Sequence, residues 1–314
     1  MGANTDTMIS IVIPLYNKER TIGRAVTSVL AQTYHDYTII IVDDGSTDNS
    51  ASIVNQLNDA PIRLISQSNQ GVSAARNRGI AESTSEWIAF LDADDEWHPN
   101  LLEEYTRLAT LYPQCNVVAS AYGYRDATGK YKSLTLNRLP FEGTNGILSN
   151  YFDVAAHSNP PICSSSIMVR KQSLLAIGGF PTGIRQGEDL LTWAKLAIHN
   201  QIAYTTQCLS TFYPERVSYY GQPSRIPESN DPVGYELETL LNNHPNISGL
   251  RSYVGHWHKM RASIFLRLPG YRSHATNEIT QAMRYLSDHR KLHLYKSLLL
   301  LPYKIRMKLF ETIG

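Results

Sequence analysis

Apolar runs rich in β-branched residues alternate with amphipathic segments along the first part of the chain. The runs predict buried strands, because a strand covered on both faces of a sheet reads as continuously hydrophobic. The segments between them repeat apolar residues at the i, i+3, i+4 and i+7 spacing of one helix face. The predicted strands are Ile9 to Leu15, Thr38 to Asp43, Ile62 to Ser66, Trp87 to Asp92 and Val117 to Tyr122.

Strands that alternate with amphipathic helices are typical of an α/β fold with a mostly parallel sheet flanked by helices. After a turn-rich stretch, three further elements are predicted: a strand over Ser165 to Arg170, a helix over Gly187 to Asn200 and a strand over Ala203 to Tyr213. Prolines then mark a linker, and the remainder reads as helical. We therefore expect a domain over residues 1–214 and a mainly helical C-terminal region over residues 215–314.

Polar residues follow four of the predicted strands at the point where each strand ends. Ligands bind at the carboxyl ends of the strands in open α/β sheets, so these residues are expected to line one crevice. They are Tyr16-Asn17 after Pro14, Asp43-Asp44, Asn69-Gln70-Gly71, and Asp92-Ala93-Asp94-Asp95.

The acidic turn from Asp92 to Asp95 is the sharpest local feature. Three carboxylates within four residues repel one another unless a cation, positive groups or water offsets the repulsion. Such oxygen ligands suit Mg²⁺ or Mn²⁺ shared with a diphosphate. The alternative is a solvated acidic turn that caps the helix after Pro99, and an isolated motif of this kind fits both.

Three other polar features have both a structural and a functional interpretation. Ser46 or Thr47 can cap the following helix, which leaves the adjacent acids Asp43 and Asp44 unexplained. Arg76 is either a surface charge or a phosphate contact near a helix start. The pair Glu188-Asp189 at a helix start complements the helix dipole, and it gains a further role only if the fold brings it to the crevice.

Composition narrows the function classes. The 314 residues carry a formal net charge of +1, which gives no support for a nucleic-acid partner. Cys115, Cys163 and Cys208 are scattered, so neither a disulfide framework nor a zinc site is expected, and a reducing compartment fits. A signal-like N-terminus and an apolar run long enough to span a membrane are both missing, so we expect a cytoplasmic location.

Seven strings in this order resemble the family 2 glycosyltransferases, which have the GT-A fold, over roughly Met8 to Tyr213. Each string is short, and their order and spacing together make the resemblance specific. The strings are SIVIPLYN from Ser10, AQTYHDYTIIIVDDGSTD from Ala31, NQGVSAARNRGI from Asn69, EWIAFLDADDEWHPNLL from Glu86, SSIMVRK from Ser165, IGGF from Ile177 and GEDLLTWAKL from Gly187.

The resemblance implies a nucleotide-sugar half at about residues 8–122 and an acceptor half at about residues 123–214. In the first half, Tyr16 would stack on a uracil ring beside Pro14, and Asp44 would read the base with Asp43 as its neighbour. Arg76 would lie near the diphosphate. The implied donor-binding residues are Pro14, Tyr16, Asn17, Asp43, Asp44, Arg76, Asp92 and Ala93.

The resemblance also implies the chemistry of the site. Asp94, with Asp92 near the ribose, would hold Mg²⁺ or Mn²⁺. Asp189 matches the general base of the family, with Glu188 beside it. Acceptor or sugar contacts are expected from a more loosely defined set, namely Asp95, Trp97, Tyr122, His157 and Trp193.

The resulting hypothesis is an inverting glycosyltransferase. It would move a hexose or N-acetylhexosamine from a UDP-sugar to an acceptor hydroxyl in bacterial surface polysaccharide or lipid-linked oligosaccharide assembly. A sugar nucleotidyltransferase is one alternative, although the segment from Pro14 to Lys18 lacks the Gly-rich basic loop expected of it. A non-catalytic domain that binds a nucleotide sugar is the other.

The C-terminal end combines basic and apolar residues between Lys291 and Phe310. A basic amphipathic helix can lie on an anionic membrane surface, which would suit a lipid-linked glycan acceptor at the cytoplasmic face of the inner membrane. The alternative is a helix packed on its own domain or in a dimer.

Overall fold

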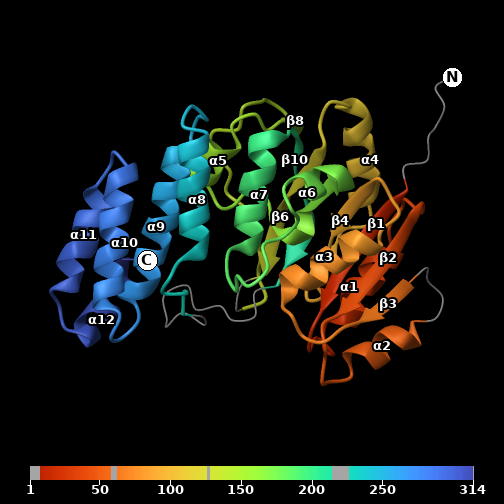
Figure 1. Ribbon diagram of the computed structural model, residues 1–314, viewed down its shortest axis with the longest axis horizontal. Coiled ribbons are helices and arrows are strands. Elements are labelled where there is room, and N and C mark those ends of the chain that lie inside the picture. The colour runs from red at the N-terminus through yellow and green to blue at the C-terminus, as the bar shows by residue number, and fades with distance from the viewer. Residues whose placement is uncertain (1–7, 58–61, 126–127, 214–225, 314) are drawn as a thin grey trace. The chain divides into compact units, whose positions relative to one another are not determined.

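The computed structural model describes residues 8–57, 62–125, 128–213 and 226–313. The chain divides into two compact units, which are considered separately (Figure 1). The first unit contains residues 1–149 and 160–213, and the second contains residues 150–159 and 214–314. Residues 150–159 therefore belong to the second unit, although the sequence suggests that they lie within the first domain.

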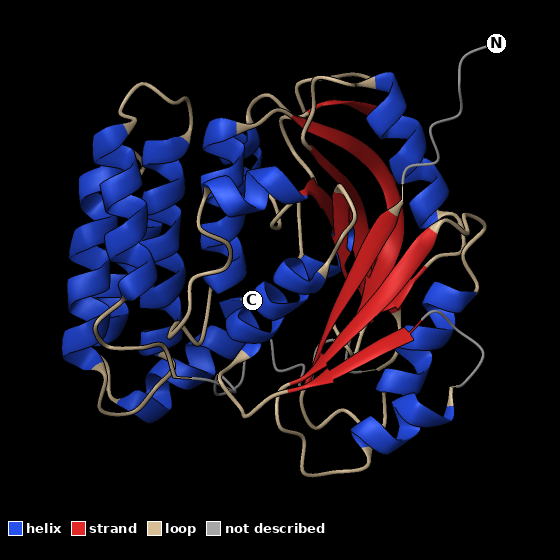
Figure 2. Cartoon of the chain, turned by 45° about the vertical axis from the view of Figure 1, so that its right-hand side comes forward, coloured by secondary structure: helices blue, strands red, loops and turns tan. Residues whose placement is uncertain are grey.

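The first unit is built on one mixed sheet with the strand order β3-β2-β1-β4-β9-β6-β10-β5 (Figure 2). Strands β3, β2, β1 and β4 are parallel, whereas β9 runs antiparallel between β4 and β6. The strands are β1 (Ile9–Leu15), β2 (Tyr37–Asp43), β3 (Ile62–Ser66), β4 (Trp87–Phe90), β5 (Glu96–Trp97), β6 (Val117–Arg125), β7 (Tyr131–Ser133), β8 (Asn145–Ile147), β9 (Ile167–Arg170) and β10 (Ile202–Phe212).

Helices cover both faces of this sheet, as the alternation of side chains along a strand requires. Ile11 and Ile13 join a core with α1 and α4, while Val12 faces α3 on the other side. A Cβ atom at Gly79 of α3 would lie 2.3 Å from Val12, so this glycine permits close packing of the helix on the sheet. The helices of the unit are α1 (Ile22–Leu30), α2 (Ser50–Gln56), α3 (Val72–Glu82), α4 (Leu101–Leu111), the 3₁₀ turn η1 (Ser164–Ser166), α6 (Lys171–Ala176) and α7 (Glu188–His199).

The second unit is helical throughout its described part. Helix α9 contacts α5, α8, α10 and α11. An apolar core that includes Phe265, Ile279 and Leu292 joins α9, α10 and α11. The helices are α5 (Tyr151–His157), α8 (Pro232–Asn243), α9 (Leu250–Leu266), α10 (Arg272–Tyr285), α11 (Arg290–Leu299) and α12 (Tyr303–Ile313). The expected α/β fold with a helical C-terminal region is confirmed. Within the described ranges, no helix has both the length and the apolarity to cross a membrane.

Candidate active site

The loop after β1 is fastened to the loop after β2. Asn17 adopts a left-handed backbone with φ of 51°, and its backbone N–H donates to Ser46 Oγ over 3.0 Å. Its side-chain oxygen accepts a 2.8 Å hydrogen bond from the Thr47 N–H. Ser46 and Thr47 thus hold the first loop and do not cap helix α2, where the first N–H, that of Ser50, donates to Asp48 Oδ1 at 2.9 Å. This corrects the capping interpretation. The loop leaves Tyr16 47% exposed beside the buried Pro14.

Asp44 organises the approach to α3. Its Oδ1 accepts hydrogen bonds from the Gln67 side chain at 2.8 Å and from the Gln70 N–H at 2.9 Å, and its Oδ2 accepts from the Gly71 N–H at 2.8 Å. Each carboxylate oxygen has two lone pairs, so a nucleobase would have to use Oδ2. Asp43 is also buried, and its Oδ1 accepts from the Ser46 N–H at 3.0 Å.

The acidic turn after β4 gives each carboxylate a different partner. Asp92 Oδ1 lies 2.7 Å from an Arg76 nitrogen, and Asp94 Oδ2 lies 2.7 Å from Lys18 Nζ. Asp95 accepts hydrogen bonds from Ser165 Oγ at 2.5 Å and from the Tyr213 N–H at 3.1 Å. Side chains from three separate segments therefore offset a repulsion that the local sequence leaves uncompensated.

Burial separates the roles of these acids. Burial and repulsion from Asp92 and Asp94 raise the pKa of the Asp95 carboxyl well above its ordinary value. The side chains of Asp92 and Asp94 remain 29% and 21% exposed. Partly exposed carboxylate oxygens are ligands that Mg²⁺ and Mn²⁺ prefer, so Asp92 and Asp94 fit a divalent ion and the buried Asp95 does not.

Arg76 joins the acidic turn to the start of α7. Its side chain is 3% exposed, and its guanidinium contacts Asp92 at 2.7 Å and Glu188 at 3.2 Å. Although burial alone would lower it, the charges of these two carboxylates raise the pKa of Arg76 above its ordinary value. Arg76 is therefore an internal clamp, and the surface-charge interpretation is excluded.

The clamp brings Asp189 to the same edge of the sheet. Asp189 lies in the first turn of α7, which follows Gly187 with φ of 81°. Burial, with added repulsion from Glu188, raises the pKa of the Asp189 carboxyl to about 7, although Arg76 opposes the rise. A carboxylate with this pKa is suited to accept a proton near neutral pH.

Comparison with known protein families matches residues 10–178 to "Glycosyl transferase family 2". The chain belongs to this family. Its sequence is similar to an uncharacterized glycosyltransferase of Nostoc sp., with 49% identity over 113 residues, which is 35% of this chain and 34% of the relative. It is 39% identical over 99 residues to an Escherichia coli protein named UDP-Glc:alpha-D-GlcNAc-diphosphoundecaprenol beta-1,3-glucosyltransferase WfgD, covering 31% of this chain and 39% of that protein. The chain thus spans about a third of the length of these curated relatives.

Two solved structures share the fold over nearly the whole chain. The Staphylococcus aureus TarS 1–349 complex with UDP-GlcNAc has a TM-score of 0.71 and 16% identity, covering 97% of this chain and 92% of that one. The Pyrobaculum calidifontis mannosyltransferase PcManGT with GDP-Man and Mn²⁺ has a TM-score of 0.61 and 18% identity, covering 96% and 84%.

Several of the expected sugar contacts are core residues. Trp97 is 2% exposed and donates its indole N–H to the Ser165 carbonyl at 2.8 Å. Trp193 is 1% exposed, and its ring centre lies 5.5 Å from that of Phe180. Their burial, like that of Asp95, contradicts the expected contact with a sugar.

Two further expected contacts have different surroundings. Tyr122 is 8% exposed on β6. His157 belongs to α5 of the helical unit, where its Nδ1 lies 2.8 Å from the Asp153 carbonyl. Neither residue belongs to the group formed by Arg76 and the acidic turn, and their contact with a sugar stays a prediction.

Sequence reasoning missed four residues that build the site. Ser165 Oγ accepts a 3.1 Å hydrogen bond from the Asp92 N–H while it donates to Asp95, so it links the acidic turn to η1. Arg24 donates to the Asp94 carbonyl, and its guanidinium lies 3.7 Å from the centre of the Tyr213 ring. Tyr213 is the third of these residues, and Lys18, which contacts Asp94, is the fourth. Ser165 and Lys18 lie in or next to the family strings, but no local pattern marks a contact between distant segments.

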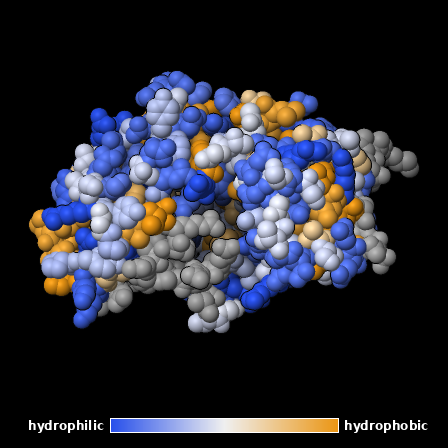
Figure 3. Space-filling view, turned by 60° about the horizontal axis from the view of Figure 1, so that its bottom comes forward, coloured by the Kyte–Doolittle hydropathy of each residue, from blue (hydrophilic) through white to orange (hydrophobic). Residues whose placement is uncertain are grey.

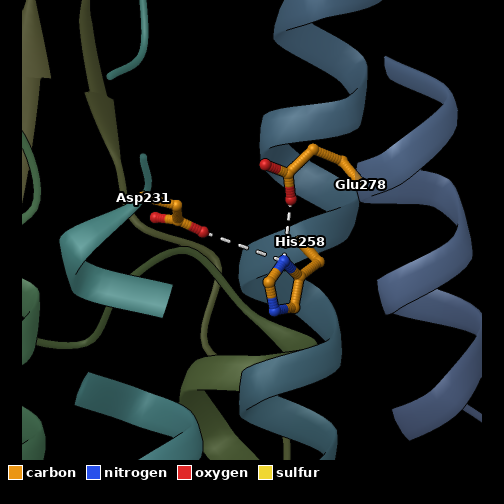
Figure 4. Close-up of side chains that lie close together, drawn as sticks. All are labelled: Asp231, His258 and Glu278. Carbon is orange, nitrogen blue, oxygen red and sulfur yellow. Dashed lines mark hydrogen bonds and ion pairs between the residues drawn. The ribbon is translucent and has the colours of Figure 1, made fainter. Parts of the chain in front are cut away.

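The helical unit contains a separate group with metal-ligand spacing, formed by Asp231, His258 and Glu278 (Figure 4). His258 Nδ1 lies 2.7 Å from Glu278, and Arg261 Nε lies 2.8 Å from Glu278 and 3.2 Å from Asp231. Although burial acts to raise it, the His258 hydrogen bond and the Arg261 charge hold the pKa of Glu278 below its ordinary value. Since Arg261 already supplies positive charge, we interpret the group as an internal ion network.

Replacing Arg76 with Met should destabilise the first unit and lower transferase activity. The change leaves Asp92 and Glu188 without their shared cation, and breaking a buried pair costs about 3 kcal/mol or more. Urea denaturation measures this loss in the free energy of unfolding. Arg78→Met on the same helix is the control, because Arg78 is 48% exposed and its pair with Glu82 contributes only about 0.5 kcal/mol. Equal losses in the two variants would contradict the clamp.

Proposed function

We propose that this enzyme transfers a hexose or N-acetylhexosamine from a UDP-sugar to an acceptor hydroxyl with inversion, and that Asp189 is its general base. The observation that carries the proposal is the Arg76 bridge between Asp92 and Glu188. The bridge connects Asp92, a carboxylate suited to bind the donor and its metal, with the first turn of α7. That turn carries Asp189, whose carboxyl has a pKa of about 7. A displacement reaction needs these two functions beside each other.

The reaction is a single displacement. The acceptor oxygen forms a bond to the anomeric carbon while the bond from that carbon to the diphosphate oxygen breaks, and its electron pair leaves with UDP. The acceptor proton passes to Asp189. Asp92 and Asp94 would hold a divalent ion, which when bound neutralises charge on the leaving diphosphate. Attack from the opposite face inverts the anomeric configuration.

The choice of donor rests on Tyr16 and on two relatives. The exposed Tyr16 ring at the end of β1 is suited to stack on a nucleobase. TarS was solved with UDP-GlcNAc, and WfgD is named for UDP-Glc, which supports a uridine donor. PcManGT was solved with GDP-Man, so GDP is the alternative to be tested.

Calorimetric titration with UDP, GDP and dTDP tests the donor class. We expect UDP to bind in the presence of Mn²⁺ and to bind at least tenfold more weakly in EDTA, because a bound divalent ion would be shared with the diphosphate. Selectivity for GDP would support the same binding site but would assign a GDP-sugar as the donor. Release of pyrophosphate from UTP and a sugar phosphate would instead favour the nucleotidyltransferase alternative.

Asp189→Asn should abolish transfer and leave UDP binding intact, since the amide cannot accept the proton. Loss of a general base lowers kcat by about 10²–10⁴-fold. In the unchanged enzyme, kcat/KM should fall as the pH drops through about 7, because Asp189 becomes protonated. Transfer of radiolabelled sugar measured from pH 5.5 to 8.5 tests both results. Glu103→Gln, which neutralises an exposed carboxylate on α4, is the control. A flat profile would contradict the base assignment.

The proposed acceptor is a lipid-linked or surface glycan. WfgD is named for an acceptor on diphosphoundecaprenol, which supports a lipid-linked substrate. In the helical unit, the described exposed residues of α11 and α12 include Lys291, Lys296, Lys304 and Lys308, with Leu294, Leu300 and Ile305 between them. Leu300 is 75% exposed, and the sequence from His289 to Phe310 has no acidic residue. In Figure 3, apolar groups lie among hydrophilic ones on the left side of the view.

These exposed basic and apolar side chains would suit an anionic lipid surface, because each lysine near such a surface contributes about 1 kcal/mol and salt weakens the attraction. We expect the enzyme to float with vesicles that contain anionic lipid at low salt, and to remain in the soluble fraction at high salt. Replacing Lys296 and Lys304 with Glu should abolish flotation, while Lys132→Glu in the first unit should not. Equal recovery with neutral and anionic vesicles would refute the proposed membrane contact.

A further inference from the structure

Lys18 contacts the residue that is expected to hold the metal. Its Nζ lies 2.7 Å from Asp94 Oδ2, and the two side chains are 24% and 21% exposed. The backbone of Lys18 is fixed on both sides, since its N–H donates to Ser50 Oγ at 2.8 Å and its carbonyl accepts from the Ile22 N–H at 2.9 Å. The fold therefore aims this side chain at the acidic turn.

The backbone of Asp94 is fixed by a separate contact. Its backbone carbonyl accepts a hydrogen bond from Arg24 of α1, and Arg24 stacks on the Tyr213 ring. The Arg24 contact thus fixes the backbone that carries the Asp94 carboxylate, and this carboxylate lies within reach of Lys18. An ammonium at 2.7 Å and a divalent ion at about 2.1 Å repel each other if they share one carboxylate oxygen.

We propose that Lys18 is a built-in counter-ion of Asp94 that competes with a divalent metal and moves to the diphosphate when the donor binds. The inference rests on the proposed function, in which a nucleotide sugar and a metal meet at Asp94. Lys18 offsets the charge of Asp94 before the donor arrives. Once it leaves Asp94, its charge is free to contact a phosphate oxygen, for which a flexible ammonium is well suited.

The exchange makes metal and nucleotide depend on each other. Lys18 weakens binding of the metal alone, and a diphosphate that draws Lys18 away removes that competition. By linkage, the metal must then strengthen nucleotide binding by the same factor. This coupling adds to the one that a metal shared with the diphosphate already produces, and a lysine that only stabilised the loop would not add it.

The test compares Lys18→Gln with the unchanged enzyme and with Lys18→Arg. Binding of Mn²⁺ alone is measured by electron paramagnetic resonance, and binding of UDP with Mn²⁺ by calorimetry. We expect Lys18→Gln to bind Mn²⁺ alone about two- to fivefold more tightly, the effect of removing a partly exposed ion pair. The same variant should bind UDP with Mn²⁺ on the order of tenfold more weakly, because a charged hydrogen bond to the diphosphate is lost. Lys18→Arg should behave much more like the unchanged enzyme.

Lys171→Gln is the matched control, because it removes the same charge at the opposite edge of the sheet, where Lys171 Nζ contacts the Ser83 carbonyl at 2.7 Å. Weaker or unchanged binding of Mn²⁺ alone by Lys18→Gln would overturn the proposal, while UDP binding by the unchanged enzyme would still support the proposed function. Failure of the unchanged enzyme to bind any nucleotide would overturn both.

Discussion

The buried guanidinium of Arg76 is the constraint on which the site depends. It is held by Asp92 after β4 and by Glu188 at the start of α7, two segments far apart in the sequence. A buried charge is tolerated only when its partners are in place, so each of the three side chains requires the other two. The acidic turn and the first turn of α7 are consequently held together by one interaction, and a shift of α7 would separate Arg76 from one of its two partners.

The acidic turn shows why the charges of neighbouring residues in the sequence were an incomplete guide to the role of each carboxylate. Three carboxylates within four residues look unstable or metal-bound when only their spacing is considered. In the fold, Asp92, Asp94 and Asp95 face Arg76, Lys18 and Ser165, which come from three other segments. The turn is therefore a junction of the structure as well as a candidate ligand site. Burial divides its members, since Asp95 is enclosed and the other two reach the solvent.

Elements set by local hydrophobic pattern could be predicted from the sequence, whereas contacts between segments could not. The bounds of β1 and β3 agree with the apolar runs, and α7 differs by one residue at each end. Strand β4 ends at Phe90 rather than Asp92, and the short strand β5 was missed, because pairing with β10 rather than composition creates it. Trp97 and Trp193 were misjudged since an aromatic side chain suits a sugar face and a core equally well, and only tertiary packing decides between them.

The two cations that contact the turn differ in a way that assigns them different tasks. Arg76 is 3% exposed and spans two carboxylates with a rigid planar group, a geometry that favours a fixed position. Lys18 carries a point charge on a flexible stem and is 24% exposed. An incoming diphosphate would have to break the Arg76 clamp to recruit its guanidinium, but it can attract Lys18 with a small movement of one side chain. The chemistry of the two residues therefore fits a rigid cation that holds α7 to the acidic turn and, in the proposed function, a mobile cation that responds to the donor.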